Sequence, residues 1–599
     1  MTQNINDTLK APSWQMDDAY GRIGSDRWNA SVEKVKQLIA TLKIGDAGAV
    51  QAMLTVYEEA LTLHSSLACF AKCTGAKDST DASVAPAEDM LAQLKSDLEA
   101  AAQPLFAAIE SLKADDALWQ QEPLAHWKFF ADEKTTEWHH KLHPSDRAWL
   151  SVFEAKCFAP LGGIFKNLQK RVDFEAENSV GGKERIKAAK LVAVIKGAPD
   201  RVLRANVNKG LHEFYGKNGD LYASLLNELH GFRLAAFERA GVAPLEVSLH
   251  QNRMSEGALQ ALRTAILNHI DEVRQCVTLR APFFGGEKLA VYDLMAPAPV
   301  SGGKVPVLIP YEDGIGMVKK ALASVNPAMA DFIDMMLANG WLEAEVSDKK
   351  IGGAFYSRFN EFKIPRVFST YLGTITAILQ QGHELGHAFH YWQMRDLPMI
   401  ETEFPMTLTE TASTFNEAVI RKYLFDHADE AEKFGMLWQE MRSGANFLMN
   451  TMVRMEFELA FLKEREKGTV SAKRCCELMD AAWRLWYGDT TEGSDSFLWA
   501  YKLHYYKTDQ LIYNYPYTVG FLLSQALMVE LKRRGADFYP FYIRMLRDTG
   551  RMTVDDVIRT HFEADASDPK FWENAMQGVL QSVRDFAAAS KTQLNRSFS

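Results

Sequence analysis

Residues 380–390 of the chain read QQGHELGHAFH, a run that contains the pattern His-Glu-x-x-His. In a helix with 3.6 residues per turn, His383 and His387 lie one turn apart on the same face, where two imidazoles can bind one Zn²⁺. Glu384 is offset from His383 by about 100° around the helix axis, so its carboxylate can reach a water at an open metal position. The pattern predicts the metal-binding helix of a zinc hydrolase.

The same run has a structural alternative, a buried helix whose histidines are hydrogen-bonded by carbonyls or carboxylates. Gly382 and Gly386 argue against that alternative. Each glycine inside a helix costs about 1 kcal/mol relative to alanine, and it usually marks the close approach of something else. We therefore expect another element to pack tightly against this helix.

A catalytic zinc takes three protein ligands and keeps one position for water, so a third ligand is needed. The metzincin arrangement requires Gly at position 390 and His at position 393, and it is excluded because the chain has His390 and Gln393. A downstream glutamate is favoured instead. The candidates are Glu401, Glu403, Glu410 and Glu417.

Their positions separate these four glutamates into two pairs. Glu401 and Glu403 fall in a predicted loop, whereas Glu410 and Glu417 lie seven residues apart on one face of a helix expected to begin near Thr407. This spacing would let Glu410 bind the metal while Glu417 orients a ligand imidazole. Thr407 and Glu410 also fit a capping box, in which Glu410 would serve the helix's own amides. Spacing alone leaves both interpretations open.

A second candidate cluster lies at residues 504–517, where His504 is accompanied by five tyrosines. Attack of water on a peptide carbonyl builds negative charge on its oxygen, and a phenol or imidazolium aimed there stabilises the transition state. The alternative is an aromatic core segment whose hydroxyls are hydrogen-bonded internally. From the residues alone, the core segment is the favoured interpretation.

Taken together, these segments resemble the oligoendopeptidase F and thimet oligopeptidase family of zinc metallopeptidases. The resemblance rests on HELGHAFH at 383–390 and on ETAS at 410–413 with a second glutamate seven residues after the first. It is extended by LAVYDLMAP at 289–297, GGAF at 352–355 and DASDPKFW at 565–572, and covers roughly residues 200 to 585. It implies a mainly α fold, with two helical lobes that flank a deep substrate cleft and a small β-sheet near the zinc-binding helix.

The resemblance also implies roles for individual residues. Glu410 corresponds to the third zinc ligand, beside His383 and His387, and Glu417 to the later glutamate that supports the metal site. The catalytic groups implied are Glu384, His504 and Tyr517, and the implied substrate contacts in the tyrosine-rich segment are Tyr506, Tyr513 and Tyr515.

Two further expectations concern residues near the metal motif. The strand-like residues 352–357 would offer a sheet edge to an extended peptide, with Gly353 and Ala354 as contacts, although an ordinary edge strand with a glycine bulge fits equally well. His390 follows His387 by one turn. We expect it to support the site or to pack, because a catalytic zinc keeps a position open.

Composition limits the class of protein. A chain of 599 residues and 67.4 kDa exceeds one ordinary core, so we expect an N-terminal helical lobe over residues 1–200 and a catalytic domain over 201–599. The net charge of -10 argues against nucleic-acid or anionic-membrane partners. With no signal-like start, no bilayer-length apolar run and six scattered cysteines, a cytoplasmic protein is expected.

Local patterns predict the order of elements. Residues 30–115 have apolar positions spaced by three and four and are expected to be helical. Residues 159–163, with Pro160 and two glycines, are expected to form a loop, and the Pro- and Gly-rich residues 281–312 a non-helical tract. Short strands are expected there and near residues 342–370.

These expectations combine into one predicted function. The chain would hydrolyse internal bonds of short peptides as an oligoendopeptidase with one Zn²⁺, using Glu384 as general base. Two alternatives stay open. One is a zinc exopeptidase of the dipeptidyl carboxypeptidase type, and the other is an inactive helical scaffold that binds peptides.

Overall fold

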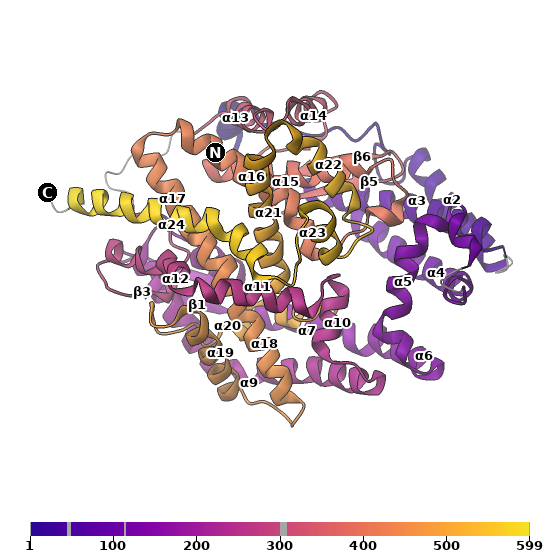
Figure 1. Ribbon diagram of the computed structural model, residues 1–599, viewed down its shortest axis with the longest axis horizontal. Coiled ribbons are helices and arrows are strands. Elements are labelled where there is room, and N and C mark those ends of the chain that lie inside the picture. Colours follow the sequence, from indigo (N-terminus) through magenta and orange to yellow (C-terminus); the bar gives the residue numbers. More distant parts are fainter. Residues whose placement is uncertain (1, 45–48, 113–115, 300–307, 598–599) are drawn as a thin grey trace. The chain divides into compact units, whose positions relative to one another are not determined.

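The computed structural model describes residues 2–44, 49–112, 116–299 and 308–597, and helices dominate it (Figure 1). The helices are α1 (Thr2–Leu9), α2 (Asp26–Ile44), α3 (Val50–Lys77), α4 (Val84–Glu110), α5 (Lys128–Thr136), α6 (Pro144–Phe153), α7 (Ala159–Gln169), α8 (Ala188–Gly197), α9 (Arg201–Ala240), α10 (Pro244–Gln251), α11 (Glu256–Asn268), α12 (Ile270–Thr278), α13 (Tyr311–Ala323), α14 (Pro327–Ala338), α15 (Ile375–Met394), α16 (Met406–His427), α17 (Glu430–Gly444), α18 (Thr451–Arg465), α19 (Ala472–Tyr487), α20 (Leu498–Tyr501), α21 (Tyr515–Arg534), α22 (Phe538–Asp548), α23 (Val554–Phe562) and α24 (Pro569–Ser597).

The strands are short and form small sheets. They are β1 (Asp173–Glu177), β2 (Lys183–Lys187), β3 (Leu289–Ala290), β4 (Leu342–Glu343), β5 (Phe355–Phe359), β6 (Ile364–Phe368) and β7 (Thr491–Glu492). The predicted fold class, mainly α with a small sheet, is confirmed. The deep cleft expected from the resemblance stays a prediction.

The chain divides into two compact units, each assembled from three segments. The first unit comprises Met1–Thr135, Lys304–His427 and Leu527–Glu563, and the second comprises Thr136–Gly303, Ala428–Ala526 and Ala564–Ser599. The lobe and domain boundary expected at residue 200 follows chain order and stays a prediction.

The core of the first unit joins the N-terminal helices to the sheet. Val32, Val35 and Ile39 of α2 are buried, as their spacing of three and four residues predicts, and they belong to one apolar cluster with residues of α3 and α4. Phe359 of β5 and Phe368 of β6 lie in the same cluster. The helices predicted over residues 30–115 are therefore confirmed for the described residues 30–44 and 49–112, and they share a core with the sheet. Residues 45–48 and 113–115 lie outside the described residues.

This sheet has the order β4-β6-β5, with β4 parallel and β5 antiparallel to β6. Among the described residues β5 pairs with β6 alone, so it is an edge strand. The strand expected from residue 352 begins at Phe355 instead, because Gly353 turns the backbone with φ +101°. Both β5 and β6 pack against α15, which confirms a small sheet beside the helix that carries the metal motif.

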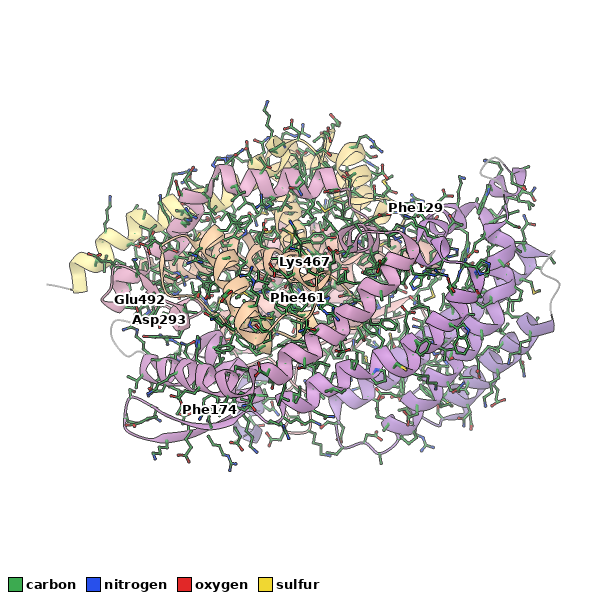
Figure 2. The ribbon with its side chains drawn as sticks, turned by 90° about the horizontal axis from the view of Figure 1, so that it is seen from below. Phe129, Phe174, Asp293, Phe461, Lys467 and Glu492 are labelled. Atoms are coloured by element: carbon green, nitrogen blue, oxygen red, sulfur yellow. The ribbon has the colours of Figure 1, made fainter. Side chains whose placement is uncertain are left out.

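The second unit is organised around the long helix α9, which Asp200 caps at its N-terminus and Gly241 ends in the left-handed region at φ +66°. Asp293, labelled in Figure 2, is fully buried. It accepts charge-assisted hydrogen bonds from two arginines of this helix, Arg204 at 2.6 Å and Arg201 at 2.8 Å. The short segment around Asp293 is thereby fixed to α9.

Residues 159–163 do not form the expected loop, because they open helix α7. Pro160 is the second residue of α7 and follows the π-helix Glu154–Phe158 directly, where the i→i−4 hydrogen bonding is already interrupted. The described residues 281–299 contain no α-helix, but the 3₁₀-helices η5 (Ala281–Phe284) and η6 (Val291–Asp293) lie among them, so the expected non-helical tract is only partly confirmed. The next α-helix, α13, begins at Tyr311. The rest of that tract lies outside the described residues.

None of the helices in the described part of the chain is both long enough and apolar enough to cross a bilayer.

Helices α15 and α16 of the first unit lie side by side (Figure 1) and meet most closely at the two glycines of the metal motif. A Cβ on Gly386 would lie 2.6 Å from Ser413 Cα and 2.8 Å from the Ala412 carbonyl oxygen, both backbone atoms of α16. A Cβ on Gly382 would meet the Ile420 side chain. The tight packing expected from these glycines is confirmed.

Substituting Gly386 tests this contact. Gly386→Ala should destabilise the protein by about 1–3 kcal/mol, because backbone atoms of α16 must move to admit the methyl group. Gly316→Ala is the matched control, since a Cβ at this helical glycine of α13 meets nothing within 4 Å. It should be neutral or stabilising by up to about 1 kcal/mol. Thermal or denaturant unfolding measures both, and equal transitions for the two variants would contradict the close approach.

Candidate metal centre

Two imidazoles and one carboxylate converge between α15 and α16. His383 Nε2 lies 3.3 Å from Glu410 Oε2, and His387 Nε2 lies 3.5 Å from the same oxygen. One ligand atom from each of the three residues lies within 4.8 Å of the others. His383, His387 and Glu410 therefore make a cluster that can hold one metal ion.

The start of α16 decides between the two interpretations of Glu410. The N–H groups of Leu408 and Thr409 donate to the Pro405 carbonyl, so the helix has already begun at Met406. Thr407 thus lies inside the first turn rather than at the cap, and Glu410 Oε2 faces the histidines of α15. The capping-box alternative does not describe this helix.

Glu417 holds the first histidine from its other side. Its Oε1 lies 2.6 Å from His383 Nδ1, and its Oε2 accepts a hydrogen bond from Arg421 at 3.1 Å. Since a carboxylate only accepts, Nδ1 carries the proton of the neutral imidazole and Nε2 is left for a metal. Ser413 Oγ donates to Glu410 Oε2 at 2.9 Å. Ser413 and Arg421 were not predicted, although their offsets of three and four residues from Glu410 and Glu417 would have indicated them.

The electrostatics of the cluster suit a cation. Burial by itself lowers the pKa of His383, but hydrogen bonds with Glu410 and Glu417 outweigh it and raise that pKa well above its usual range. Burial by itself raises the pKa of Glu410, but the hydrogen bonds from His383 and His387 bring it well below its usual range. The donor set of two imidazoles and a carboxylate is one that Zn²⁺ accepts, and a metal would replace the proton between Nε2 and Oε2.

Glu384 adds a further carboxylate beside the cluster, buried with 7% of its surface exposed. Burial raises the pKa of Glu384, while the neighbouring His383 and His387 lower it in part. From the edge strand β5, the ring of Tyr356 stacks on His387 with centroids 5.6 Å apart. The sequence carries no local signal for this tyrosine, because β5 is brought to α15 by the fold.

His390 lies on α15 but outside the cluster. It is fully buried, and its Nε2 lies 3.1 Å from the Leu546 carbonyl and 2.9 Å from Thr549 Oγ1 in the segment that ends α22. Its ring stacks on Phe404. Burial lowers the pKa of His390 to about 3, so the imidazole is neutral and ties α15 to α22.

The other two candidate glutamates also lie outside the cluster, in the connection between α15 and α16. Glu401 is bound by His126 at 2.6 Å and by Arg551 at 3.3 Å, and Glu403 pairs with Arg358. Both carboxylates thus have cationic or imidazole partners of their own.

In the second unit, His504, Tyr513 and Tyr517 form a cluster. The His504 ring lies 5.2 Å from that of Tyr513 and stacks on that of Tyr517 at 5.6 Å. Burial and the nearby Lys502 lower the pKa of His504 to about 3, and its Nδ1 lies 2.7 Å from Asn514 Oδ1. A neutral imidazole that donates from Nδ1 leaves Nε2 as an acceptor. The catalytic role expected for His504 stays a prediction.

Tyr506 and Tyr515 belong to the core of the second unit. The Tyr515 hydroxyl donates to the Ser248 carbonyl at 3.1 Å, and the Tyr506 hydroxyl donates to the Tyr222 carbonyl at 3.4 Å. Both side chains are buried, and Tyr506 stacks on Phe165. Buried phenols bonded to backbone carbonyls match the core-segment alternative, and the substrate contacts expected for these two tyrosines stay a prediction.

Comparisons with known proteins agree with this site. No family model matches the chain. The oligopeptidase PepF of Bacillus subtilis (strain 168) is 21% identical over 564 residues, which cover 91% of this chain and 82% of that protein. An oligoendopeptidase F homolog of Lactococcus lactis subsp. lactis (strain IL1403) is 21% identical over 479 residues, which cover 76% of this chain and 77% of that protein.

Solved structures share the fold. A provisionally assigned peptidase of Chlamydophila abortus has a TM-score of 0.82 at 18% identity and covers 96% of this chain and 98% of its own. Oligoendopeptidase-F of Enterococcus faecium has a TM-score of 0.66 at 17% identity, with 94% and 97% covered, and PZ peptidase A, solved with an inhibitor, has 0.70 at 17%, with 93% and 97% covered. Over most of its length the chain is therefore a homologue of the oligoendopeptidase F proteins, and its His383, His387 and Glu410 cluster has the composition expected of them.

Proposed function

We propose that the chain is a zinc-dependent oligoendopeptidase that cleaves internal bonds of short peptides. The observation that carries the proposal is the convergence of His383 Nε2, His387 Nε2 and Glu410 Oε2 beside the buried carboxylate of Glu384. The oligopeptidase PepF of Bacillus subtilis is a relative over most of the chain, which supports a peptide as the substrate.

Zn²⁺ held by these three residues would supply Lewis acidity, lowering the pKa of water towards about 7 and polarising the scissile carbonyl. Glu384 is the general base, whose carboxylate takes the proton of the attacking water and passes it to the leaving amine. Burial raises the pKa of Glu384, which makes its carboxylate a stronger base towards the proton of the water. Glu417 keeps the proton of His383 on Nδ1 and so keeps Nε2 available.

Two further groups of residues would serve the peptide. The phenols of Tyr517 and Tyr513 are proposed hydrogen-bond donors to the carbonyl oxygen as it gains charge, with His504 packed between them as an acceptor. The edge strand β5 is the proposed binding site for the peptide backbone, which would add to the sheet as another strand. Gly353 and Ala354, which precede β5, are the proposed contacts.

The first test is the product pattern from an unblocked peptide of about ten residues, digested by zinc-loaded wild type and by Glu384→Gln and analysed by mass spectrometry. Internal cleavage by the wild type is expected. Glu384→Gln should be slower by about 10²-fold to 10⁴-fold, the usual contribution of a positioned acid-base group, and should keep its zinc. Loss of zinc from this variant would contradict the role of Glu384.

The same digest separates the competing functions. Stepwise removal of terminal residues by the wild type would indicate an exopeptidase of the dipeptidyl carboxypeptidase type. Zinc-free protein that cleaves no peptide, also after zinc is added, would indicate a peptide-binding scaffold.

Glu417→Gln tests the support of the first histidine. Removing the charge behind His383 should weaken zinc binding by about 10-fold to 100-fold, because such partners fix the imidazole and raise its basicity. Competition with a chromogenic chelator measures the affinity without reference to activity. Asp426→Asn, on the same helix and paired with Lys422, is the matched control and should bind zinc as the wild type does.

Tyr517→Phe tests the proposed donor in the second unit. Its kcat should fall by about 10²-fold to 10³-fold, as expected when one oxyanion donor is removed, with zinc content unchanged. Tyr515→Phe is the control, since its hydroxyl serves the Ser248 carbonyl, and it should change stability by about 1 kcal/mol rather than kcat. A slow Tyr515→Phe beside an unaffected Tyr517→Phe would reverse the two assignments.

A further inference from the structure

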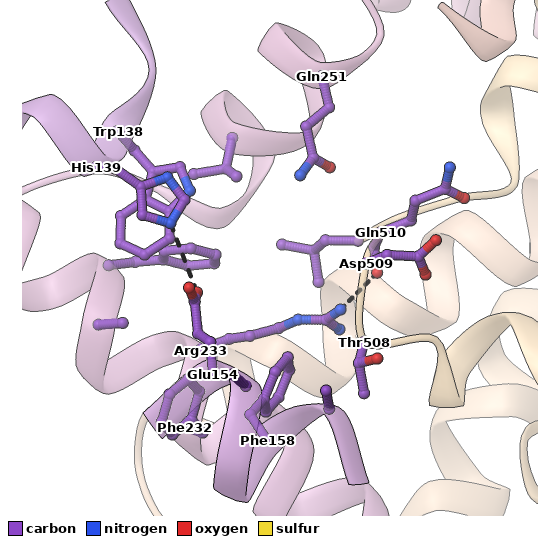
Figure 3. Close-up of a pocket in the computed structure, with 16 residues that line it drawn as sticks. Trp138, His139, Glu154, Phe158, Phe232, Arg233, Gln251, Thr508, Asp509 and Gln510 are labelled. Atoms are coloured by element: carbon purple, nitrogen blue, oxygen red, sulfur yellow. Dashed lines mark hydrogen bonds and ion pairs between the residues drawn. The ribbon is translucent and has the colours of Figure 1, made fainter. Parts of the chain in front are cut away.

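Residues 507–514 form an irregular loop between the 3₁₀-helix η9 (Leu503–Tyr506) and α21, and this loop carries Tyr513. One side of it, from Thr508 to Leu511, is a wall of a cavity of about 410 Å³ in the second unit (Figure 3). The opposite walls are aromatic, with Trp138, Phe158, Phe232 and Phe237 among them. Because the cavity leaves this side of the loop without close packing, specific contacts must hold the loop backbone in place.

The first of those contacts is Arg233 of α9. Arg233 has 6% of its surface exposed, and one nitrogen of its guanidinium donates to the carbonyls of Lys507 at 2.7 Å and Gln510 at 2.6 Å. Figure 3 shows the side chain running along the floor of the cavity to the loop, above the ring of Phe158. Arg233 thus binds both ends of the turn that begins the loop.

The second contact is Glu458 of α18, which is buried with 2% exposed. Its Oε1 accepts the backbone N–H of Ile512 at 2.8 Å, and its Oε2 is buried without a hydrogen-bond partner among the described residues. Ile512 has φ +50°, a left-handed conformation that is strained for a β-branched side chain. The carboxylate of Glu458 therefore fixes the backbone at Ile512, where the loop conformation is strained.

Keeping two charges buried costs stability. Burial raises the pKa of Glu458 to about 7 against the opposing effects of the Ile512 N–H and of Arg233, and burial lowers the pKa of Arg233 to about 10. Well-packed apolar residues in place of a buried pair are often neutral or stabilising. A role beyond stability would account for the pair.

That role is indicated by what the clamped backbone carries. Ile512 is followed directly by Tyr513 and Asn514, and Asn514 Oδ1 receives the hydrogen bond of His504 Nδ1. The rings of His504, Tyr513 and Tyr517 contact one another. Rotation of the backbone at residue 512 would therefore displace Tyr513 and Asn514, and with them the contacts they make to His504 and Tyr517.

We propose that Arg233 and Glu458 are positioning residues, which hold the 507–514 loop so that Tyr513, Tyr517 and His504 keep one geometry towards the peptide. This inference rests on the proposed function. The two residues touch the loop backbone and are not themselves catalytic.

The test compares Glu458→Leu, which removes the acceptor for Ile512, with Glu458→Gln, whose amide oxygen can still accept that N–H. The milder Glu458→Asp withdraws the carboxylate by one methylene and serves where Glu458→Leu fails to fold. Glu456→Leu is the matched control, because Glu456 lies on the same helix but pairs with Arg263. Arg233→Met tests the second positioning residue, because it removes the donor to the Lys507 and Gln510 carbonyls.

Glu458→Leu, Glu458→Asp and Arg233→Met should lower kcat by about 10-fold to 100-fold, the scale of a small misplacement of catalytic groups, with KM within about threefold and zinc content unchanged. The kcat of Glu458→Gln should lie within about threefold of the wild-type value, and the kcat of Glu456→Leu should equal the wild-type value. Hydrogen exchange over residues 507–517 should quicken in the three impaired variants alone.

Wild-type kcat and exchange in folded Glu458→Leu or Glu458→Asp would overturn the proposal, and so would a Glu458→Gln as impaired as Glu458→Leu. The two readouts also separate this inference from the proposed function. A wild-type protein that cleaves no peptide would overturn the proposed function and, with it, the contribution of Arg233 and Glu458 to catalysis. If the wild type is active, unchanged hydrogen exchange in the variants would overturn only the positioning role of Arg233 and Glu458.

Discussion

The contact between α15 and α16 at Gly386 is the constraint on which the metal centre depends. His383 and His387 are set by one helix, but Glu410 comes from another, and its carboxylate reaches both Nε2 atoms because the two backbones approach without an intervening Cβ. A Cβ at position 386 would lie 2.6 Å from Ser413 Cα, closer than ordinary van der Waals contact, so α16 would have to move away from the helix that carries the two histidines. The glycine is thus part of the coordination geometry although it offers no ligand atom.

Buried charge has a consistent use in this protein, which is to fix backbone or a functional side chain rather than to form isolated ion pairs. Asp293 fixes its segment to α9, Glu401 fixes the connection between the two metal helices, and Glu417 orients His383. Each arrangement costs desolvation, and each gains hydrogen bonds that the low-dielectric interior strengthens. Glu458 and Arg233 fit this pattern, with the loop backbone as the group that is held.

Sequence predicts those features of the site that depend on helical periodicity. The spacing of His383 and His387 and that of Glu410 and Glu417 follow from 3.6 residues per turn, and the glycines indicated close packing before any partner was known. The capping box could not be separated from a ligand in this way, because both interpretations use the same local spacing and differ only in which helix lies opposite. For Tyr506 and Tyr515 the sequence offered five similar phenols, and burial against Tyr222 and Ser248 depends on residues about 270 to 280 positions away.

The arrangement of charge favours a metal ion over a network of ion pairs alone in this candidate site. Two carboxylates, Glu410 and Glu417, face opposite nitrogens of the His383 ring, and this is what raises its pKa. An imidazolium satisfies both carboxylates, but a metal at Nε2 satisfies Glu410 together with His387 and still leaves the Nδ1 proton for Glu417. Proton and metal therefore compete for one nitrogen, and the second histidine gives the metal a contact that the proton cannot make. Glu417 strengthens the binding of either a proton or a metal at His383 Nε2. The preference for a metal therefore depends on the convergence of α15 and α16.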